Sequence, residues 1–214
     1  MTGRVHNSFD IIKRVPYATQ PREAPPKENW KNPSAEYYFI ISDNRRVLAY
    51  SFDHVLLCRK TENLEILRTW KIDPPLEAYR LDLSPNGEYI AAEIANELYI
   101  SKRKEYFISV FSVKTGVEIA RLPLQDPTSF AVSPDGDLLA VSDRKLDEKN
   151  DEWILITNIY ELSSRNKLAS IQHDRIENRA HFEIETDFST LFTPDGQYLI
   201  ISGMNTRIWK LERQ

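Results

Sequence analysis

A short segment built around a tight turn recurs along the chain, and it limits the fold more than any other feature. Residues 130–142 read FAVSPDGDLLAVS: an apolar run, a Ser-Pro-Asp-Gly turn and a second apolar run. Residues 81–93 (LDLSPNGEYIAAE) and 190–202 (TLFTPDGQYLIIS) repeat it, and residues 39–51 (FIISDNRRVLAYS) keep the pattern without its proline and glycine. Chance apolar hairpins do not usually share a four-residue turn. We therefore interpret the four segments as copies of one structural repeat.

The turn residues have a physical role in each copy. Proline sets φ near about −65° at the first central position, and Asp or Asn suits the second. Glycine accepts the left-handed conformation that closes the hairpin. Three of the chain's six glycines, Gly87, Gly136 and Gly196, occupy this position. Each copy is therefore predicted to begin with a β-hairpin.

Further strand-like runs follow each hairpin. Val, Ile, Tyr, Phe and Trp dominate them, as is typical of β-strands. The predicted third strands are residues 54–60, 106–113, 153–162 and 206–211, and the predicted fourth strands are residues 64–72, 116–124 and 167–174. No amphipathic helix of useful length is visible. An antiparallel four-stranded unit of roughly 40–50 residues is typical of a β-propeller blade, so we expect an all-β propeller with four blades in the chain.

The pattern resembles WD-repeat β-propellers over about residues 36–212. The residues that carry the resemblance are the turns that begin at Ser84, Ser133 and Thr193, together with Val113-Lys114-Thr115-Gly116 and Ile208-Trp209-Lys210-Leu211. The Trp-Asp dipeptide and the Gly-His pair of the family are missing. The hydrogen-bond network that those residues build in typical members is therefore not predicted here, and the resemblance is to a divergent, WD-like propeller.

The repeat divides the chain into an N-terminal part and four blades. We expect an N-terminal strand near residues 8–18 and a proline-rich connector within residues 1–35. The four blades are expected over residues 36–214, at about 36–73, 78–125, 128–174 and 186–212.

The fourth blade lacks a fourth strand of its own. The resemblance implies that the N-terminal strand completes it, and Pro16 suits such an outer edge because an edge strand tolerates a missing N–H. The alternative is that residues 8–18 form a disordered tail.

Four blades leave the closure of the ring open. WD-like blades usually close in rings of seven or eight. Two copies of the chain could form one eight-bladed ring, four blades could close alone, or the chain could be part of a longer propeller. The sequence favours the homodimer among the three, and its N-terminal strand could complete a blade of either chain.

Composition excludes few partners. The net charge of −4 provides no global attraction to nucleic acid or to an anionic membrane, and no run approaches the roughly 18 apolar residues of a membrane helix. The single cysteine, Cys58, alternates with apolar strand residues and is expected in the core as an inert thiol. We expect a cytoplasmic protein, or a periplasmic one if a signal peptide has been removed.

The longer connections are expected to gather on one face of the propeller. Turns between strands 1 and 2, and between strands 3 and 4, are tight; the extra residues fall between strands 2 and 3 and between blades. Binding residues concentrate on such loops. Four segments provide the candidate partner-binding residues. The basic hairpin tip contains Lys102, Arg103 and Lys104, and the first inter-blade connection contains Tyr79 and Arg80. Trp153 begins the strand beside the acidic hairpin tip, and the last inter-blade connection contains Arg175 and Arg179.

No catalytic or cofactor motif is present in the sequence. There is no Gly-x-Ser-x-Gly elbow, P-loop or His-Glu-x-x-His sequence, and the spacing of His173 and His181 matches no metal motif. We therefore expect no catalytic residues, no cofactor and no metal. The favoured function is a non-catalytic scaffold for an unidentified protein partner. A hydrolase or lyase acting at the central channel, and a structural module of a larger assembly, are the alternatives.

Overall fold

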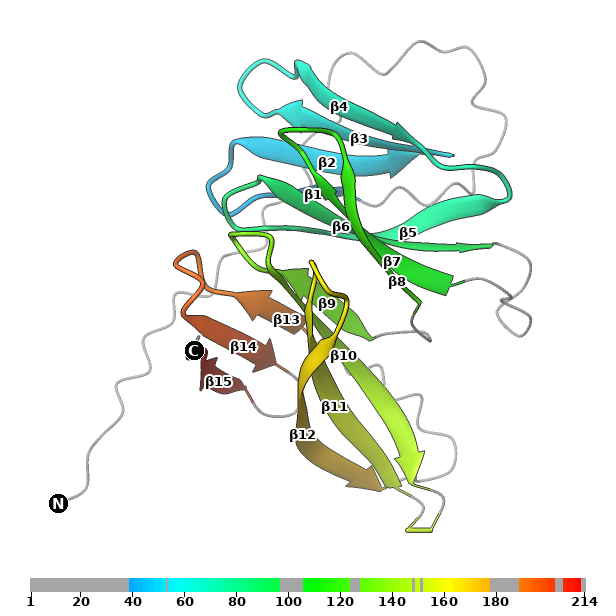
Figure 1. Cartoon of the computed structure of the whole chain (residues 1–214), viewed down its shortest axis with the longest axis vertical. Helices are drawn as coiled ribbons and strands as arrows, with labels where there is room; N and C mark the ends of the chain where they lie inside the picture. Colours follow the sequence, from blue (N-terminus) through cyan, green and yellow to red (C-terminus); the bar gives the residue numbers. More distant parts are fainter. Residues whose placement is uncertain are drawn as a thin grey trace, which may run out of the picture. The chain divides into compact units, whose positions relative to one another are not determined.

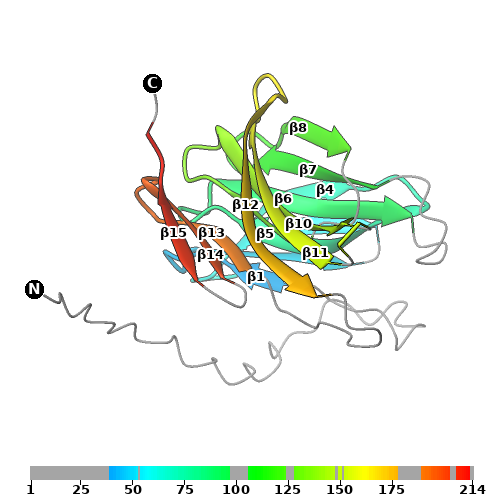
Figure 2. The same cartoon turned by 90° about the horizontal axis from the view of Figure 1, so that it is seen from below.

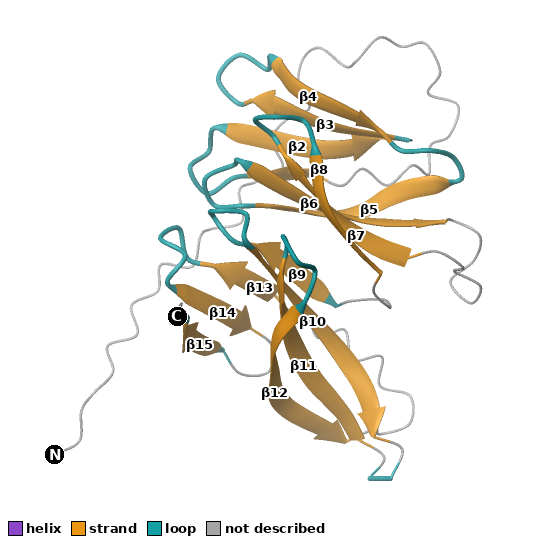
Figure 3. Cartoon of the chain, viewed as in Figure 1, coloured by secondary structure: helices purple, strands orange, loops and turns teal. Residues whose placement is uncertain are grey.

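The computed structural model describes residues 39–52, 54–96, 106–123, 128–147, 149–150, 152–177, 189–202 and 206–212. The chain divides into two units, residues 1–35 and 36–214, and the first lies outside the described residues. All regular secondary structure in the described part is β-strand (Figure 3). The described part of the chain therefore contains no helix that is long and apolar enough to cross a bilayer.

The strands form four antiparallel sheets in sequence order (Figure 1). The first sheet contains β1 (Phe39–Ile41), β2 (Val47–Phe52), β3 (Val55–Lys60) and β4 (Ile66–Lys71). The second contains β5 (Leu76–Leu83), β6 (Tyr89–Asn96), β7 (Tyr106–Ser112) and β8 (Glu118–Pro123). The third contains β9 (Ser129–Val132), β10 (Leu138–Asp147), β11 (Glu152–Glu161) and β12 (Lys167–Glu177), and the fourth contains β13 (Ser189–Phe192), β14 (Tyr198–Ser202) and β15 (Arg207–Lys210).

The four sheets are the blades of a β-propeller, as the repeat predicts. Their innermost strands contact one another in turn, β1 with β5, β5 with β9 and β9 with β13. A hydrophobic core lies between each consecutive pair of blades, and it is built from alternating residues of the facing sheets. The all-β fold with four antiparallel blades is therefore confirmed.

The described part of blade 4 is a three-stranded meander, with β13, β14 and β15 side by side in that order (Figure 2). The sequence predicted this shortage of one strand. The proposed replacement, residues 8–18, lies outside the described residues, as does the proline-rich connector.

Each repeat turn is closed by the same three hydrogen bonds. In blade 3 the Ser133 hydroxyl donates to Asp135 Oδ1 at 2.6 Å, and it accepts the backbone N–H of Leu138 at 2.9 Å. Asp135 Oδ1 also accepts the N–H of Asp137 at 3.1 Å. The same pattern recurs from Ser42, Ser84 and Thr193.

The left-handed position of the turn is also common to the four blades. Gly87, Gly136 and Gly196 have φ values of 74°, 73° and 68°, as predicted, and Arg45 takes the position in blade 1 with φ 57°. The first hairpin therefore keeps the turn geometry without its glycine.

Asparagine side chains connect these turns from one blade to the next. Asn44 Nδ2 donates to the carbonyl of Asn86 at 2.7 Å, and Asn86 Nδ2 donates to the carbonyl of Pro134 at 2.6 Å. The turns between strands 3 and 4 join the same surface, because Val113 N–H donates to the carbonyl of Glu88 at 2.9 Å. We call this side of the molecule, which carries the turns between strands 1 and 2 and between strands 3 and 4, the turn face.

Replacing Asn86 by aspartate is expected to weaken the contact between blades 2 and 3. The carboxylate keeps the acceptor oxygen used by Ser84 and Glu88 but loses the N–H that reaches Pro134. We expect a loss of about 1–2 kcal/mol in unfolding free energy, measured by urea titration. The control is Asp135→Asn, which preserves the acceptor oxygen of its own turn and should change stability by less than about 0.5 kcal/mol. Equal effects of the two substitutions would contradict this role for Asn86.

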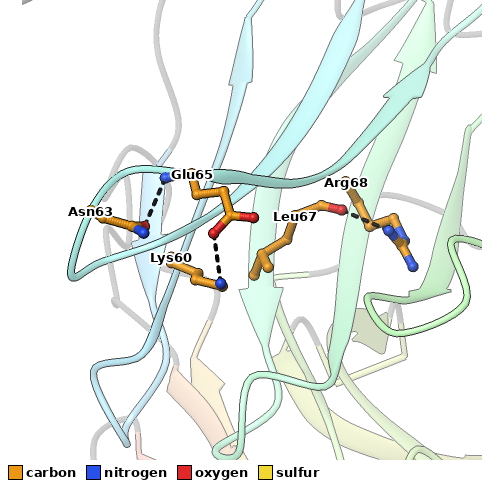
Figure 4. Close-up of polar contacts among 5 residues, drawn as sticks. All are labelled: Lys60, Asn63, Glu65, Leu67 and Arg68. Atoms are coloured by element: carbon orange, nitrogen blue, oxygen red, sulfur yellow. Dashed lines mark hydrogen bonds and ion pairs between the residues drawn. The ribbon is translucent and has the colours of Figure 1, made fainter.

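The outer strand of blade 1 is linked to β7 and the following turn of blade 2 in a second way. Trp70 Nε1 donates to the carbonyl of Gly116 at 2.8 Å, and the Trp70 ring packs on Phe111 with centroids 5.2 Å apart. Arg68 donates to the carbonyl of Lys114 and to that of Leu67, the latter at 2.8 Å (Figure 4). Position 70 is thus a tryptophan because it supplies both apolar area and a donor at the blade interface.

The turn between β3 and β4 is tightened by its own polar contacts. Asn63 Oδ1 accepts the Glu65 N–H at 3.0 Å, and Lys60 Nζ pairs with Glu65 Oε2 at 2.6 Å (Figure 4). The Lys60–Glu65 pair is exposed and contributes little to stability. The Asn63 contact instead fixes the backbone around Leu64, which has φ 59°.

Candidate interaction surface

Blade 3 carries a longer three-stranded extension beyond its inner strand than the other blades have within the described residues. The inner strand β9 pairs with β10 only at Leu139–Ser142, whereas β10 and β11 continue to pair as far as Asp147 and Glu152. Strand β12 follows β11 to Glu177. We call the strand segments beyond β9, residues 143–147, 152–156 and 172–177, the blade 3 ribbon (Figure 1).

The pairing register divides the ribbon into two faces. Trp153 lies opposite Leu146 on one side and Ile176 on the other, so these three positions share one face. Lys145 lies opposite Ile154, which lies opposite Arg175, so position 175 belongs to the other face. The Trp153 side chain is half-buried, and its neighbour Leu155 on the same face is buried. One face of the ribbon thus combines these apolar positions with Arg144, which lies opposite Leu155, and the other face mixes apolar, basic and acidic positions.

Asp147 holds the tip of the ribbon together. Its carboxylate accepts the backbone N–H of Lys149 at 3.3 Å and the side-chain amide of Asn150 at 2.9 Å, and its carbonyl accepts the Asn150 N–H at 3.2 Å. The acidic tip predicted from the sequence therefore includes one carboxylate with a structural role in the turn.

A chain of hydroxyl groups connects the base of the ribbon to blade 4. Thr190 Oγ1 contacts Ser129 Oγ and Ser142 Oγ, each at 2.6 Å. Ser142 Oγ contacts Thr157 Oγ1 at 2.7 Å, and Thr157 Oγ1 contacts His173 Nε2 at 2.8 Å. Because Ser142, Thr157 and Thr190 are buried, each must use its hydroxyl in this way.

His173 ends this chain and also reaches the next blade. Its ring makes a T-shaped contact with the Trp209 ring, with centroids 6.4 Å apart. The sequence did not predict this network. One sequence signal could have indicated the network: β10, β11 and β13 each carry a hydroxyl residue, Ser142, Thr157 or Thr190, at a position where an apolar residue would be expected.

The structure corrects the placement of Tyr79 and Arg80. Both lie within β5 rather than in a connection between blades, because the strand begins at Leu76 and continues through an irregularity between Ala78 and Arg80. Arg80 pairs with the buried carboxylate of Glu93 and donates from Nη1 to the carbonyl of Thr128 at 2.7 Å. Arg80 therefore joins blades 2 and 3 and neutralises a buried charge.

The remaining candidates divide between described and undescribed parts of the chain. Lys102, Arg103, Lys104 and Arg179 lie outside the described residues. Trp153 lies in β11 and Arg175 in β12, two neighbouring strands of the ribbon. The structure thus brings Trp153 and Arg175 into one element, although they are distant in sequence.

Two observations bear on chemical reactivity elsewhere in the described part of the molecule. Cys58 is fully buried, as predicted, and burial raises the pKa of its thiol to about 12. Such a thiol is protonated and poorly nucleophilic. Within the described ranges, no group of three or more His, Cys, Asp or Glu side chains is arranged to hold a metal ion.

Comparison with known proteins places the chain by its fold. No family model matches the sequence, and no curated protein matches it. Among solved structures, "KlHsv2 with loop 6CD replaced by a Gly-Ser linker" is similar with a TM-score of 0.54 and 15% identity, over 83% of this chain and 53% of that one. Kuenenia stuttgartiensis hydrazine synthase matches with a TM-score of 0.43 and 14% identity, over 76% of this chain and 48% of that one.

The four blades and the first of these matches define the class of protein. The chain is a β-propeller protein by architecture. It spans about half the length of the solved chains it matches. The identities are too low to carry an activity or a partner from either structure to this chain.

Proposed function

We propose that this chain is a non-catalytic, WD-like propeller scaffold that binds a protein partner on the face opposite the turn face. The observation that carries the proposal is the asymmetry between the two faces. On the turn face the hairpins are short and hydrogen-bonded to one another from blade 1 to blade 3. On the opposite face blade 3 extends its ribbon beyond its inner strand.

The blade 3 ribbon has properties suited to protein binding. Its backbone is held by two continuous strand pairings, and its base is anchored to blade 4 through the hydroxyl chain. A surface fixed in advance loses less conformational entropy when a partner binds. Trp153 and Arg175 are of the residue types that most often dominate interface energetics. We propose these two residues, which belong to opposite faces of the ribbon, as the principal contacts of a partner that reaches both faces.

The basic segment Lys102–Lys104 is proposed as a second contact region. It belongs to the connection between β6 and β7, which joins strands 2 and 3 of blade 2. The equivalent connection in blade 3 is the tip of the ribbon. We propose that the two connections contact the same partner, with the basic segment facing acidic groups on it.

The test compares proteins recovered from an extract of the source cells by wild-type and variant chains, quantified by mass spectrometry. Trp153→Ala, and separately a Lys102→Glu, Arg103→Glu and Lys104→Glu triple variant, should reduce recovery of the specific partner at least tenfold. The control is the triple reversal of Arg45, Arg46 and Lys114 to glutamate. It changes net charge equally at exposed turn-face positions and should leave recovery unchanged. Equal recovery by all variants, or loss only in the control, would overturn the proposal.

A further inference from the structure

Positions that are equivalent in the four blades show where a neighbouring blade is missing. The residue just before each turn serine or threonine faces the preceding blade. In blades 2, 3 and 4 this residue is Leu83, Val132 and Phe192, with exposures of 6%, 1% and 1%, and each belongs to the core shared with the blade before it. In blade 1 the same position is Ile41, and it is 48% exposed.

Other large apolar residues share that face of blade 1, together with the polar residues Arg59, Thr69 and Lys71. Ile41 lies opposite Leu48, and Phe39 lies opposite Tyr50, which lies opposite Leu57. Phe39 is 65% exposed and Ile66, on the same face, is 50% exposed. A row of large apolar side chains exposed on a sheet face is typical of an interface.

Blade 4 has exposed apolar residues on its opposite face, the face that would pack against a following blade. The position that faces the following blade in β2, β6 and β10 is an alanine: Ala49, Ala91 and Ala140, each with 0% exposure. In β14 the same position is Ile200, which lies opposite Leu191 and Ile208. Leu191 is 41% exposed and Ile208 is 54% exposed, whereas the residues equivalent to Ile208 in blades 1 to 3, Cys58, Val110 and Ile159, are buried.

Within the described residues, no blade packs against this face of blade 1 or against this face of blade 4. The two faces do not cover each other within the described residues, because both are exposed. They are chemically matched, since each exposes large apolar side chains at positions that pack between blades elsewhere in this molecule. A second copy of the chain supplies both missing neighbours at once.

We propose that two copies of this chain form one eight-bladed ring, in which blade 1 of each copy packs against blade 4 of the other. Each interface joins two different surfaces, and the ring closes after two copies through a two-fold axis. Eight blades lie within the range known for propellers. The assembly does not depend on the scaffold function.

The first measurement is the molar mass of the full chain by light scattering and sedimentation velocity over a concentration series. We expect a stable species of twice the chain's 25.0 kDa. A monomer at every concentration would overturn the proposal, and it would indicate that another chain or another segment covers the two faces. Growth into larger polymers would also overturn it, because head-to-tail contacts that do not close produce filaments.

Two charged substitutions test which surfaces meet. Ile41→Lys and Ile208→Glu each place a charge in both interfaces of the ring, so each variant alone should be monomeric. An equimolar mixture should recover a dimer, because it contains one unaltered interface and one in which lysine faces glutamate. If Ile41→Lys dissociates the dimer and Ile208→Glu does not, blade 1 pairs with blade 1 and the proposal is wrong.

A matched control separates these effects from general damage. Val117 is 57% exposed and lies on neither of the two end faces, so Val117→Glu should leave the mass unchanged. All three variants alter exposed positions, and thermal unfolding should verify that each one folds. Dissociation by Val117→Glu as well would contradict an interface confined to the two end faces.

Discussion

Gly136→Ala is expected to lower the unfolding free energy by about 3 kcal/mol. Two costs combine at this position. Gly136 has φ 73°, where an alanine costs about 1–2 kcal/mol. A Cβ atom there would also overlap the Tyr89 ring carbons Cδ1, Cε1 and Cζ of the neighbouring blade, and forced overpacking typically costs 1–3 kcal/mol.

Gly196→Ala is the matched control, because it carries the first cost alone. Gly196 occupies the same turn position in blade 4 with φ 68°, but a Cβ there would lie 3.6 Å from Pro134 Cδ, which is ordinary contact. We expect a loss of about 1–2 kcal/mol in urea unfolding. Introducing Tyr89→Ala removes the ring, so Gly136→Ala in that background should cost no more than Gly196→Ala. Equal costs of the two glycine substitutions in the wild-type background would show that the contact between Gly136 and Tyr89 is unimportant.

This comparison shows what a repeat motif can and cannot predict. The Ser-Pro-Asp-Gly pattern predicts the left-handed glycine in each turn, and that prediction is confirmed. It cannot distinguish Gly136 from Gly196, because the difference lies in the neighbouring blade. Tyr89 lies 47 positions from Gly136, and only the packing of blade 2 against blade 3 brings them together.

The candidate site was predicted less well than the fold, for a related reason. Arg80 looks like an exposed basic residue in the sequence, yet it pairs with buried Glu93 in the adjacent strand. The partners of the hydroxyl residues can also be far apart in the sequence: Thr190 lies 48 positions from Ser142. Apolar strand residues such as Ile41 and Ile208 also look like core residues, because a hydrophobic pattern shows which face needs covering but not what covers it.

The stability of the protein is expected to fall as the pH rises from about 4 to about 8, because of Asp82. Asp82 lies on the face of blade 2 that packs against blade 3. On that face it lies opposite Ala91, which lies opposite Val110, and both of these residues are buried. Burial raises the pKa of Asp82 to about 8, and repulsion from Asp43 adds to the effect. The N–H of Val132, which donates to Asp82 Oδ2 at 2.9 Å, and that of Leu83 partly offset it.

The sign follows from proton binding in the two states. Between the unfolded pKa of 3.8 and the folded pKa of about 8, the native chain holds a proton that the unfolded chain has released. Raising the pH through this range therefore favours unfolding, with a slope of up to about 1.4 kcal/mol per pH unit. Below pH 4 both states are protonated, and the contribution of Asp82 to the slope disappears.

Asp82→Asn is expected to remove this slope and to make the protein more stable than the wild type at pH 8. The amide oxygen can still accept the Val132 N–H, and no charge needs to be desolvated at the blade interface. The measurement is urea unfolding at half-unit steps from pH 5 to pH 8, with the difference between wild type and variant isolating Asp82 from the histidines. Asp195→Asn is the control, since the hydrogen bonds of Asp195 lower its pKa and its titration lies below this range. If wild type and Asp82→Asn have parallel profiles, Asp82 is ionised in the native chain throughout, and the interface between blades 2 and 3 accommodates a charge.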